Sequence, residues 1–125
     1  MNKEILFTEK APAAIGPYSQ AVQLGNIIFT SGQLPIDMST GELATDIKSA
    51  TKASLENCKA IIESKGASMK DVIKTVVFLS DMNNFAEMNE VYSQYFTENF
   101  PARSCVQVAR LPKDALVEIE VIAAI

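Results

Sequence analysis

One stretch near the C-terminal end, FPARSCVQVARLPKDALVEIE, brings an arginine, a thiol and two carboxylates close together. Strand alternation puts Arg103 and Cys105 on one face of its first half, and Glu118 and Glu120 on one face of its second half. If the two halves pair as a hairpin about the turn 111–114, Cys105 lies opposite Glu118 and Arg103 opposite Glu120. A guanidinium binds a carboxylate through two parallel hydrogen bonds, and a glutamate of raised pKa serves as a general acid or base. The stretch therefore predicts a site for a small carboxylate-bearing molecule.

The same residues have a simpler interpretation. Opposite charges across a strand pair also occur in sheets without a site, where each pair contributes roughly 0.2–1 kcal/mol. The rest of the chain must decide between the two.

The amino-acid composition limits which kinds of functional site the chain can form. With 125 residues we expect one domain, 1–125. A net charge of -4 with scattered lysines argues against nucleic-acid binding. Histidine is absent, which excludes Ser-His-Asp and Cys-His nucleophiles and the usual zinc sites. No segment resembles a membrane span or signal peptide, and two cysteines without CxxC spacing indicate reduced thiols, so we expect a cytoplasmic protein that binds neither membrane nor metal.

The first predicted element is a β-hairpin. The runs 18–24 and 27–32 are separated by Gly25-Asn26, a strong two-residue turn signal. Pairing across this turn puts Tyr18 and Ser31 on the same face, near the open end of the hairpin.

Two helices and a strand follow. The apolar period predicts a helix over 46–65, with Thr45 as its N-cap, and a second helix over 83–97. The β-branched run 72–80 predicts a strand in the middle of the sheet. Cys58 falls on the apolar stripe of the first helix and is expected to be a packed core thiol.

The second helix is expected to bury an apolar stripe and to hold an asparagine, Asn89, beside it. That amide is interpreted either as a pocket residue or as a hydrogen-bond partner between helix and sheet. The apolar positions are Phe85, Met88, Tyr92 and Phe96.

The element order is therefore β-β-α-β-α-β-β, an α+β fold. Because strand-helix-strand crossovers are right-handed, both helices should cover the same face of a mixed sheet. The other face would carry apolar residues together with Tyr18, Phe29, Ser31, Arg103 and Glu118. We expect other subunits to cover this face, which places the site at or beside a subunit interface.

Four segments, APAAIGPYSQAV, FTSGQLP, KTVVFLSDMNNFAEMNEVY and the C-terminal stretch, resemble the RidA (YjgF-type) reactive intermediate deaminase family over nearly the whole chain. The resemblance implies a chorismate-mutase-like fold, a homotrimer with clefts between subunits, and no metal or organic cofactor. It implies an imine hydrolase, a 2-iminobutanoate/2-iminopropanoate deaminase. Such an enzyme converts imines and enamines such as 2-aminoacrylate, released by pyridoxal-phosphate-dependent dehydratases, to 2-oxo acids and ammonia.

The resemblance also implies roles for individual residues. Arg103 matches the arginine that binds the substrate carboxylate, and Glu118 matches the acid that orients or activates water. The remaining matches line the substrate pocket: Tyr18, Ser31, Gly32, Asn89 and Cys105.

Other functions fit the same residues. A non-catalytic sensor could hold a 2-oxo acid such as 2-oxobutyrate in the same cleft, because a carboxylate clamp serves ligand and substrate alike. Ribonuclease activity, which is also attached to this family, is disfavoured by the acidic composition and the lack of histidine. A chaperone acting through the apolar sheet face is a further alternative.

Overall fold

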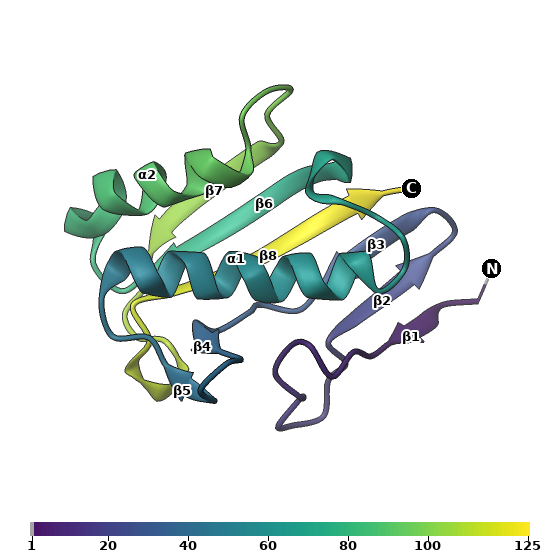
Figure 1. Cartoon of the computed structure of the whole chain (residues 1–125), viewed down its shortest axis with the longest axis horizontal. Helices are drawn as coiled ribbons and strands as arrows, with labels where there is room; N and C mark the ends of the chain where they lie inside the picture. Colours follow the sequence, from purple (N-terminus) through teal and green to yellow (C-terminus); the bar gives the residue numbers. More distant parts are fainter. Residues whose placement is uncertain (1) are drawn as a thin grey trace.

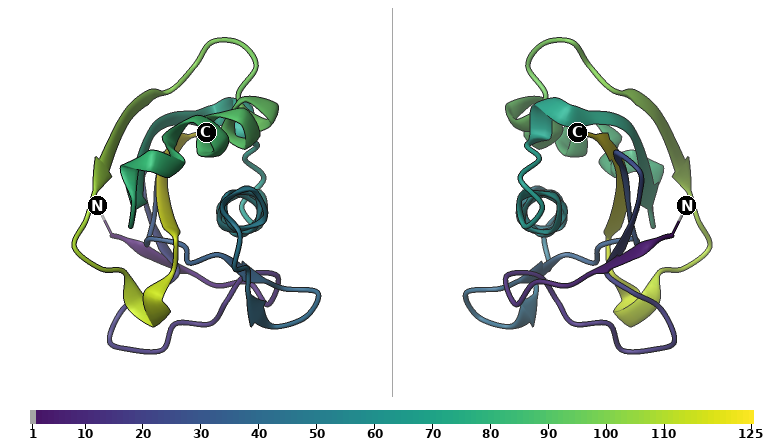
Figure 2. Two further views of the ribbon diagram at one scale, coloured as in Figure 1. Left: turned by 90° about the vertical axis from the view of Figure 1, so that its left-hand side faces the viewer. Right: turned by 90° about the vertical axis from the view of Figure 1, so that its right-hand side faces the viewer.

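A six-stranded mixed sheet forms the centre of the computed structural model, which describes residues 2–125. Its strand order is β1-β2-β3-β8-β6-β7. A separate two-stranded ribbon, β4-β5, lies beside it, and both helices pack on one side of the sheet (Figures 1 and 2). The strands are β1 (Glu4–Leu6), β2 (Ala21–Leu24), β3 (Ile27–Thr30), β4 (Ile36–Asp37), β5 (Glu42–Leu43), β6 (Val72–Leu79), β7 (Ala102–Gln107) and β8 (Val117–Ala124). The helices are α1 (Ile47–Glu63) and α2 (Phe85–Tyr95). Short 3₁₀ turns occupy Met69–Asp71, Met82–Asn84 and Pro112–Asp114.

This order confirms the predicted succession of elements. Helix α1 connects β3 to β6 and α2 connects β6 to β7, so both helices fall on the same face. Strand β1 and the β4-β5 ribbon were not predicted, because two or three residues are too few to show an alternating pattern.

The predicted hairpin is also confirmed. Val22 pairs with Phe29 and Leu24 with Ile27. Gly25 occupies the turn with a φ of 60°, a left-handed conformation that costs little for a residue without a Cβ.

The predicted pairing of the two C-terminal strands is wrong. Strand β6 lies between β7 and β8, parallel to β7 and antiparallel to β8. The reason is that α2 carries the chain from β6 over to a parallel neighbour, and the connection 108–116 then crosses the end of β6 to reach β8. Cys105 is therefore next to Val77, not opposite Glu118.

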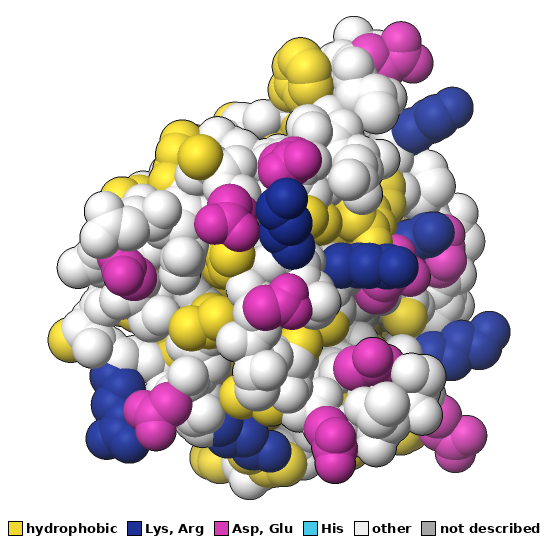
Figure 3. All heavy atoms as spheres, turned by 60° about the vertical axis from the view of Figure 1, so that its left-hand side comes forward, with side chains coloured by type: hydrophobic (Ala, Val, Ile, Leu, Met, Phe, Trp, Pro, Cys, Tyr) yellow, Lys and Arg dark blue, Asp and Glu magenta, His cyan; other side chains and the backbone are white. Residues whose placement is uncertain are grey.

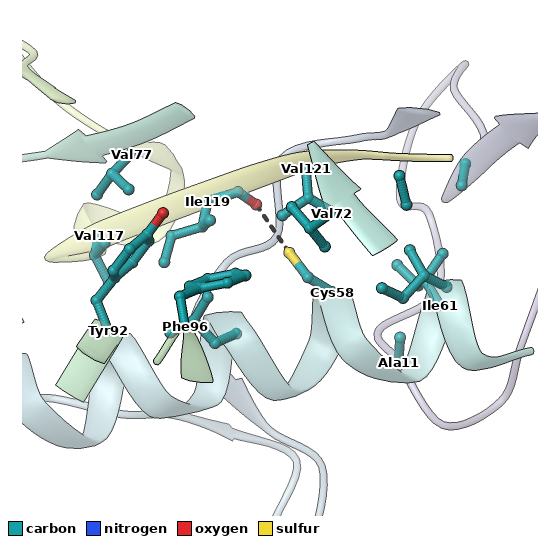
Figure 4. Close-up of a cluster of buried hydrophobic side chains, with 14 of the residues drawn as sticks. Ala11, Cys58, Ile61, Val72, Val77, Tyr92, Phe96, Val117, Ile119 and Val121 are labelled. Atoms are coloured by element: carbon teal, nitrogen blue, oxygen red, sulfur yellow. Dashed lines mark hydrogen bonds between the residues drawn. The ribbon is translucent and has the colours of Figure 1, made fainter. Parts of the chain in front are cut away.

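The core lies between the sheet and α1. Cys58 is fully buried there, and its thiol donates to the carbonyl of Ile119 at 3.3 Å (Figure 4). Burial raises the pKa of this thiol to about 12, so it stays protonated. The prediction of a packed core thiol is confirmed.

Helix α1 begins one residue later than predicted. Its N-cap is Asp46, not Thr45, and the Asp46 carboxylate accepts from the backbone N–H of Ser49 at 3.2 Å. Hydrogen bonds from Ser49 also lower the pKa of this carboxyl.

A buried hydroxyl on α1 leads to a prediction about the stability of the core. Ser54 is fully buried, and its Oγ has no hydrogen-bond partner among residues 2–125, whereas Thr51 donates to the Ile47 carbonyl at 2.8 Å. An unpaired buried hydroxyl costs free energy, and alanine also favours the helix. We therefore expect Ser54→Ala to raise the free energy of unfolding by about 1 kcal/mol. Urea unfolding at one fixed protein concentration measures it.

The matched control is Thr51→Val, which removes a hydrogen-bonded hydroxyl at similar volume and should lower stability. A loss of stability in Ser54→Ala would contradict the prediction and indicate that the hydroxyl binds an internal water.

The sheet face opposite the helices is bare and partly apolar. Ile5, Val22, Phe29 and Ile122 form one row across it, and Ile5 is 55% and Phe29 39% exposed. Val106 on β7 adds another exposed apolar side chain, 43% exposed, to the same face. Contiguous apolar surface of this kind is typical of a face that another protein surface covers.

Candidate functional site

The six candidate site residues apart from Tyr18 fall into two groups on opposite faces of the sheet. Arg103 shares a register row with Thr75 and Val121, which are buried under the helices. Glu118 shares a row with Phe78 and Val106, three residues further along β6, and so points to the bare face. The expectation that Arg103 and Glu118 lie on one face of the sheet is therefore wrong.

The first group forms around Glu118. Residues just after β3 continue alongside β8, because Gln33 and Ile119 exchange backbone hydrogen bonds of 2.7 and 3.2 Å. This pairing lays Gly32 directly against the Glu118 carboxylate. A Cβ at position 32 would collide with that carboxylate, so a larger residue here would displace the Glu118 side chain from its position.

The loop that carries Tyr18 is held beside this group by two side chains. The Gln20 amide oxygen accepts from the backbone N–H of Thr8 at 2.8 Å, and its nitrogen donates to backbone carbonyls of the same segment, including Pro12 at 2.9 Å. The Ser31 hydroxyl donates to the Ser19 carbonyl at 2.6 Å. Ser31 therefore helps to fix the loop that carries Tyr18.

Tyr18 and Gly32 line the same small hollow, of about 40 Å³, together with Lys113 from the turn before β8. Tyr18 is 50% exposed, and its hydroxyl accepts a long, 3.4 Å hydrogen bond from the Ile15 amide. This group thus combines a phenol, a glycine backbone and a carboxylate.

The Glu118 carboxyl is electrostatically unusual. Partial burial raises its pKa, and the neighbouring charge of Glu120 on the same strand face raises it further. A raised pKa is what a carboxylate needs to take up and release protons near neutral pH.

The second group forms around Arg103, under α2. Its Nη1 donates to Asn89 Oδ1 at 2.6 Å. Its guanidinium carbon lies 4.7 Å from the ring centre of Tyr92 and 5.5 Å from that of Phe85. Such contacts between a cation and an aromatic face stabilise the charge without neutralising it.

Cys105 belongs to this second group but is not an activated nucleophile. It lies two residues along β7 from Arg103, on the same face. Burial raises its thiol pKa, and the opposing effect of Arg103 is smaller. The thiol form is therefore expected at neutral pH, which suits a pocket-lining role.

A much larger hollow than the one beside Tyr18 lies elsewhere. It measures about 750 Å³, runs along the outer face of α1 and the β4-β5 turn, and contains none of the candidate residues. Its lining alternates lysines with acids, for example Lys52, Glu56 and Lys59, as on an ordinary solvated helix face. Basic and acidic side chains are likewise interspersed on the face shown in Figure 3. The chemistry of the candidate residues, and not the size of this hollow, therefore defines the candidate site.

Four residues of the site environment were not predicted as such. Gln20 and Gln33 position the Tyr18 loop and Gly32 through hydrogen bonds between distant segments, which sequence spacing does not reveal. Phe85 and Tyr92 were predicted only as core residues. Their spacing with Asn89 (i, i+4, i+7) puts all three on one helix face, a signal that could have found them.

Fold and site together define a class: α+β proteins with two helices on one face of a mixed sheet, carrying an arginine held by neutral partners and a glutamate of raised pKa. A family model described as Endoribonuclease L-PSP matches residues 8–125, and the chain belongs to this family.

Named relatives agree with the RidA-type resemblance. The 2-iminobutanoate/2-iminopropanoate deaminase of Salmonella typhimurium is 55% identical over 98% of both chains. A RutC family protein of Pyrococcus abyssi is 60% identical, again over 98% of each. The crystal structure of Escherichia coli TdcF with bound serine superposes with a TM-score of 0.93 at 53% identity, covering 98% of both chains. No helix in the described residues has the length and apolar character to cross a bilayer.

Proposed function

We propose that this protein is a 2-iminobutanoate/2-iminopropanoate deaminase, hydrolysing reactive imines and their enamine forms to 2-oxo acids and ammonia. The observation that carries the proposal is the pair of groups just described: a cation with neutral partners, and an acid of raised pKa beside a glycine. Imine hydrolysis needs a cation that binds the substrate carboxylate and an acid that carries protons, and each group supplies one of these. The name of the Salmonella relative and the serine bound to TdcF support a small amino-acid-like substrate.

The proposed site joins two copies of the chain. Arg103 and Glu118 lie on opposite sheet faces of one chain, so one chain cannot present both to a molecule the size of iminobutanoate. In a homotrimer, the β7 edge of one copy meets the bare face of the next and brings the two groups together. The exposed apolar row on that face supports this arrangement.

The proposed reaction adds water across a carbon–nitrogen double bond. Arg103 binds the substrate carboxylate and orients the imine carbon. Glu118 orients a water molecule and takes its proton as oxygen bonds to that carbon. The substrate enters as the protonated imine, so this addition gives a neutral amino alcohol. The same carboxyl then returns its proton to the nitrogen and takes the proton of the new hydroxyl, the carbon–nitrogen bond breaks as the carbonyl forms, and ammonia leaves. Tyr18, Ser31, Gly32 and Cys105 shape the pocket, in a cytoplasmic setting where dehydratases supply the imine.

A coupled assay tests the proposal. A threonine dehydratase generates iminobutanoate in the cuvette, and semicarbazide in solution traps the imine that survives. We expect this protein to accelerate the release of 2-oxobutyrate and ammonia and to reduce the trapped fraction. An unchanged imine lifetime, combined with binding of 2-oxobutyrate by calorimetry, would favour the sensor function instead.

The description of the matching family as an endoribonuclease requires a parallel control. Single-stranded RNA is incubated with the same preparation, and Arg103→Ala serves as the comparison. We expect no RNA cleavage that depends on Arg103.

A further inference from the structure

The guanidinium of Arg103 is held by neutral groups alone. Its described contacts are the Asn89 amide oxygen and the two aromatic rings, and no carboxylate within residues 2–125 lies within ion-pair distance of it. The chain's other arginine differs, since Arg110 pairs with Asp114 at 2.6 Å. Arg103 is thus a half-buried cation whose charge no carboxylate of residues 2–125 compensates through an ion pair.

The support under Arg103 is itself fixed. Tyr92 is buried, its hydroxyl is hydrogen-bonded to Thr75 Oγ1 at 2.8 Å, and its ring packs on Phe96 with centres 4.7 Å apart. Phe85, Asn89 and Tyr92 share one face of α2. The helix, the sheet through Thr75 and the core through Phe96 therefore determine together where the guanidinium lies.

A neutral acceptor has a specific advantage here. A guanidinium offers five N–H donors, and Asn89 occupies one of them. The others remain available to a ligand. An aspartate in place of Asn89 would orient Arg103 equally well, but would neutralise its charge and compete with a ligand carboxylate.

We propose that Asn89, Phe85 and Tyr92 form a positioning device that orients Arg103 for carboxylate binding while leaving its charge uncompensated. Asn89 then acts through Arg103, not by contacting the substrate, which differs from its expected role as a substrate-binding residue. The proposal rests on the proposed function in one respect, that Arg103 binds the ligand carboxylate.

The decisive variant is Asn89→Asp. We expect the Kd for 2-oxobutyrate and the KM for imine to rise at least about tenfold, with a smaller change in kcat and a melting temperature equal to or above wild type, because a new ion pair forms. Asn89→Ala should weaken binding less and lower the melting temperature. A merely structural asparagine would instead lose stability and binding together in both variants. The matched control is Gln94→Glu, which adds the same charge to the exposed face of α2.

A second measurement does not depend on any activity. With only two arginines, the guanidinium NMR signals are easily assigned through Arg103→Lys. We expect slow rotation about the Nε–Cζ bond of Arg103 in the wild type and faster rotation in Asn89→Ala and in Phe85→Leu. Fast rotation in the wild type overturns the positioning proposal, and so does unchanged binding in Asn89→Asp. If the wild type neither binds 2-oxobutyrate nor hydrolyses imine while rotation stays slow, the proposed function fails and the positioning of Arg103 stands.

Discussion

Glu118→Gln is expected to reduce kcat for imine hydrolysis by about 10²–10⁴-fold, the usual contribution of a general acid or base. Glutamine keeps the size and hydrogen bonding of the side chain but cannot carry the proton. Binding of 2-oxobutyrate should persist, because Arg103 is intact. Glu120→Gln is the matched control: it changes the neighbouring acid on the same strand face and should retain most activity. Normal turnover in Glu118→Gln would contradict the assignment of the acid.

Glu118→Gln should not lower the stability of the fold. Burial and Glu120 raise the pKa of Glu118 in the fold. The folded protein then binds this proton more tightly than the unfolded chain, so stability falls as pH rises from the unfolded pKa through the raised folded pKa. Glutamine removes that penalty. We expect Glu118→Gln to melt at or above the wild-type temperature near neutral pH, and the difference to disappear in acid, where Glu118 is protonated. Calorimetric melting at several pH values measures this.

Mixed oligomers of two inactive variants should recover activity. Arg103→Ala lacks the carboxylate clamp and Glu118→Gln lacks the acid, so each alone should be nearly inactive. If each site takes Arg103 from one subunit and Glu118 from the next, random mixing in equal amounts makes about a quarter of the sites wild type. Co-refolding the two variants and assaying imine hydrolysis tests this, and light scattering should give a mass near three times 13.6 kDa.

The matched control replaces Arg103→Ala by the double variant that carries both substitutions. Mixing it with Glu118→Gln supplies no wild-type acid, so no activity should return. Absence of recovery in the first mixture, with subunit exchange verified by a mass tag, would show that the site is not shared between subunits.

Local signals predicted the elements well, and long-range pairing was the weak point. The Gly25-Asn26 turn predicted the first hairpin correctly because only two residues separate its strands. The same logic failed for β7 and β8, where we predicted a hairpin about the turn 111–114. The actual connection, 108–116, is nine residues long and passes around the end of β6. Nothing within those residues reveals that another strand lies between them.

The sequence predicted correctly which candidate residues share a face of the same strand, but not which residues of different strands lie together. Alternation placed Arg103 with Cys105, and Glu118 with Glu120, as the structure has them. It could not relate one pair to the other, because which face of a strand meets the helices depends on tertiary packing. The contact of Gly32 with Glu118 depends likewise on Gln33 pairing with Ile119, 86 positions away along the chain.

The placement of Arg103 and Glu118 on opposite faces has a consequence for how such a protein responds to its concentration. An active site whose residues come from two copies of the chain cannot form in a monomer. Dilution that separates the subunits therefore lowers the fraction of chains that form active sites, as well as the concentration of those sites. A ligand held between two copies in turn strengthens their association by mass action. If the site is shared between copies as proposed, accumulating imine promotes the assembly of the protein that removes it, without a separate effector.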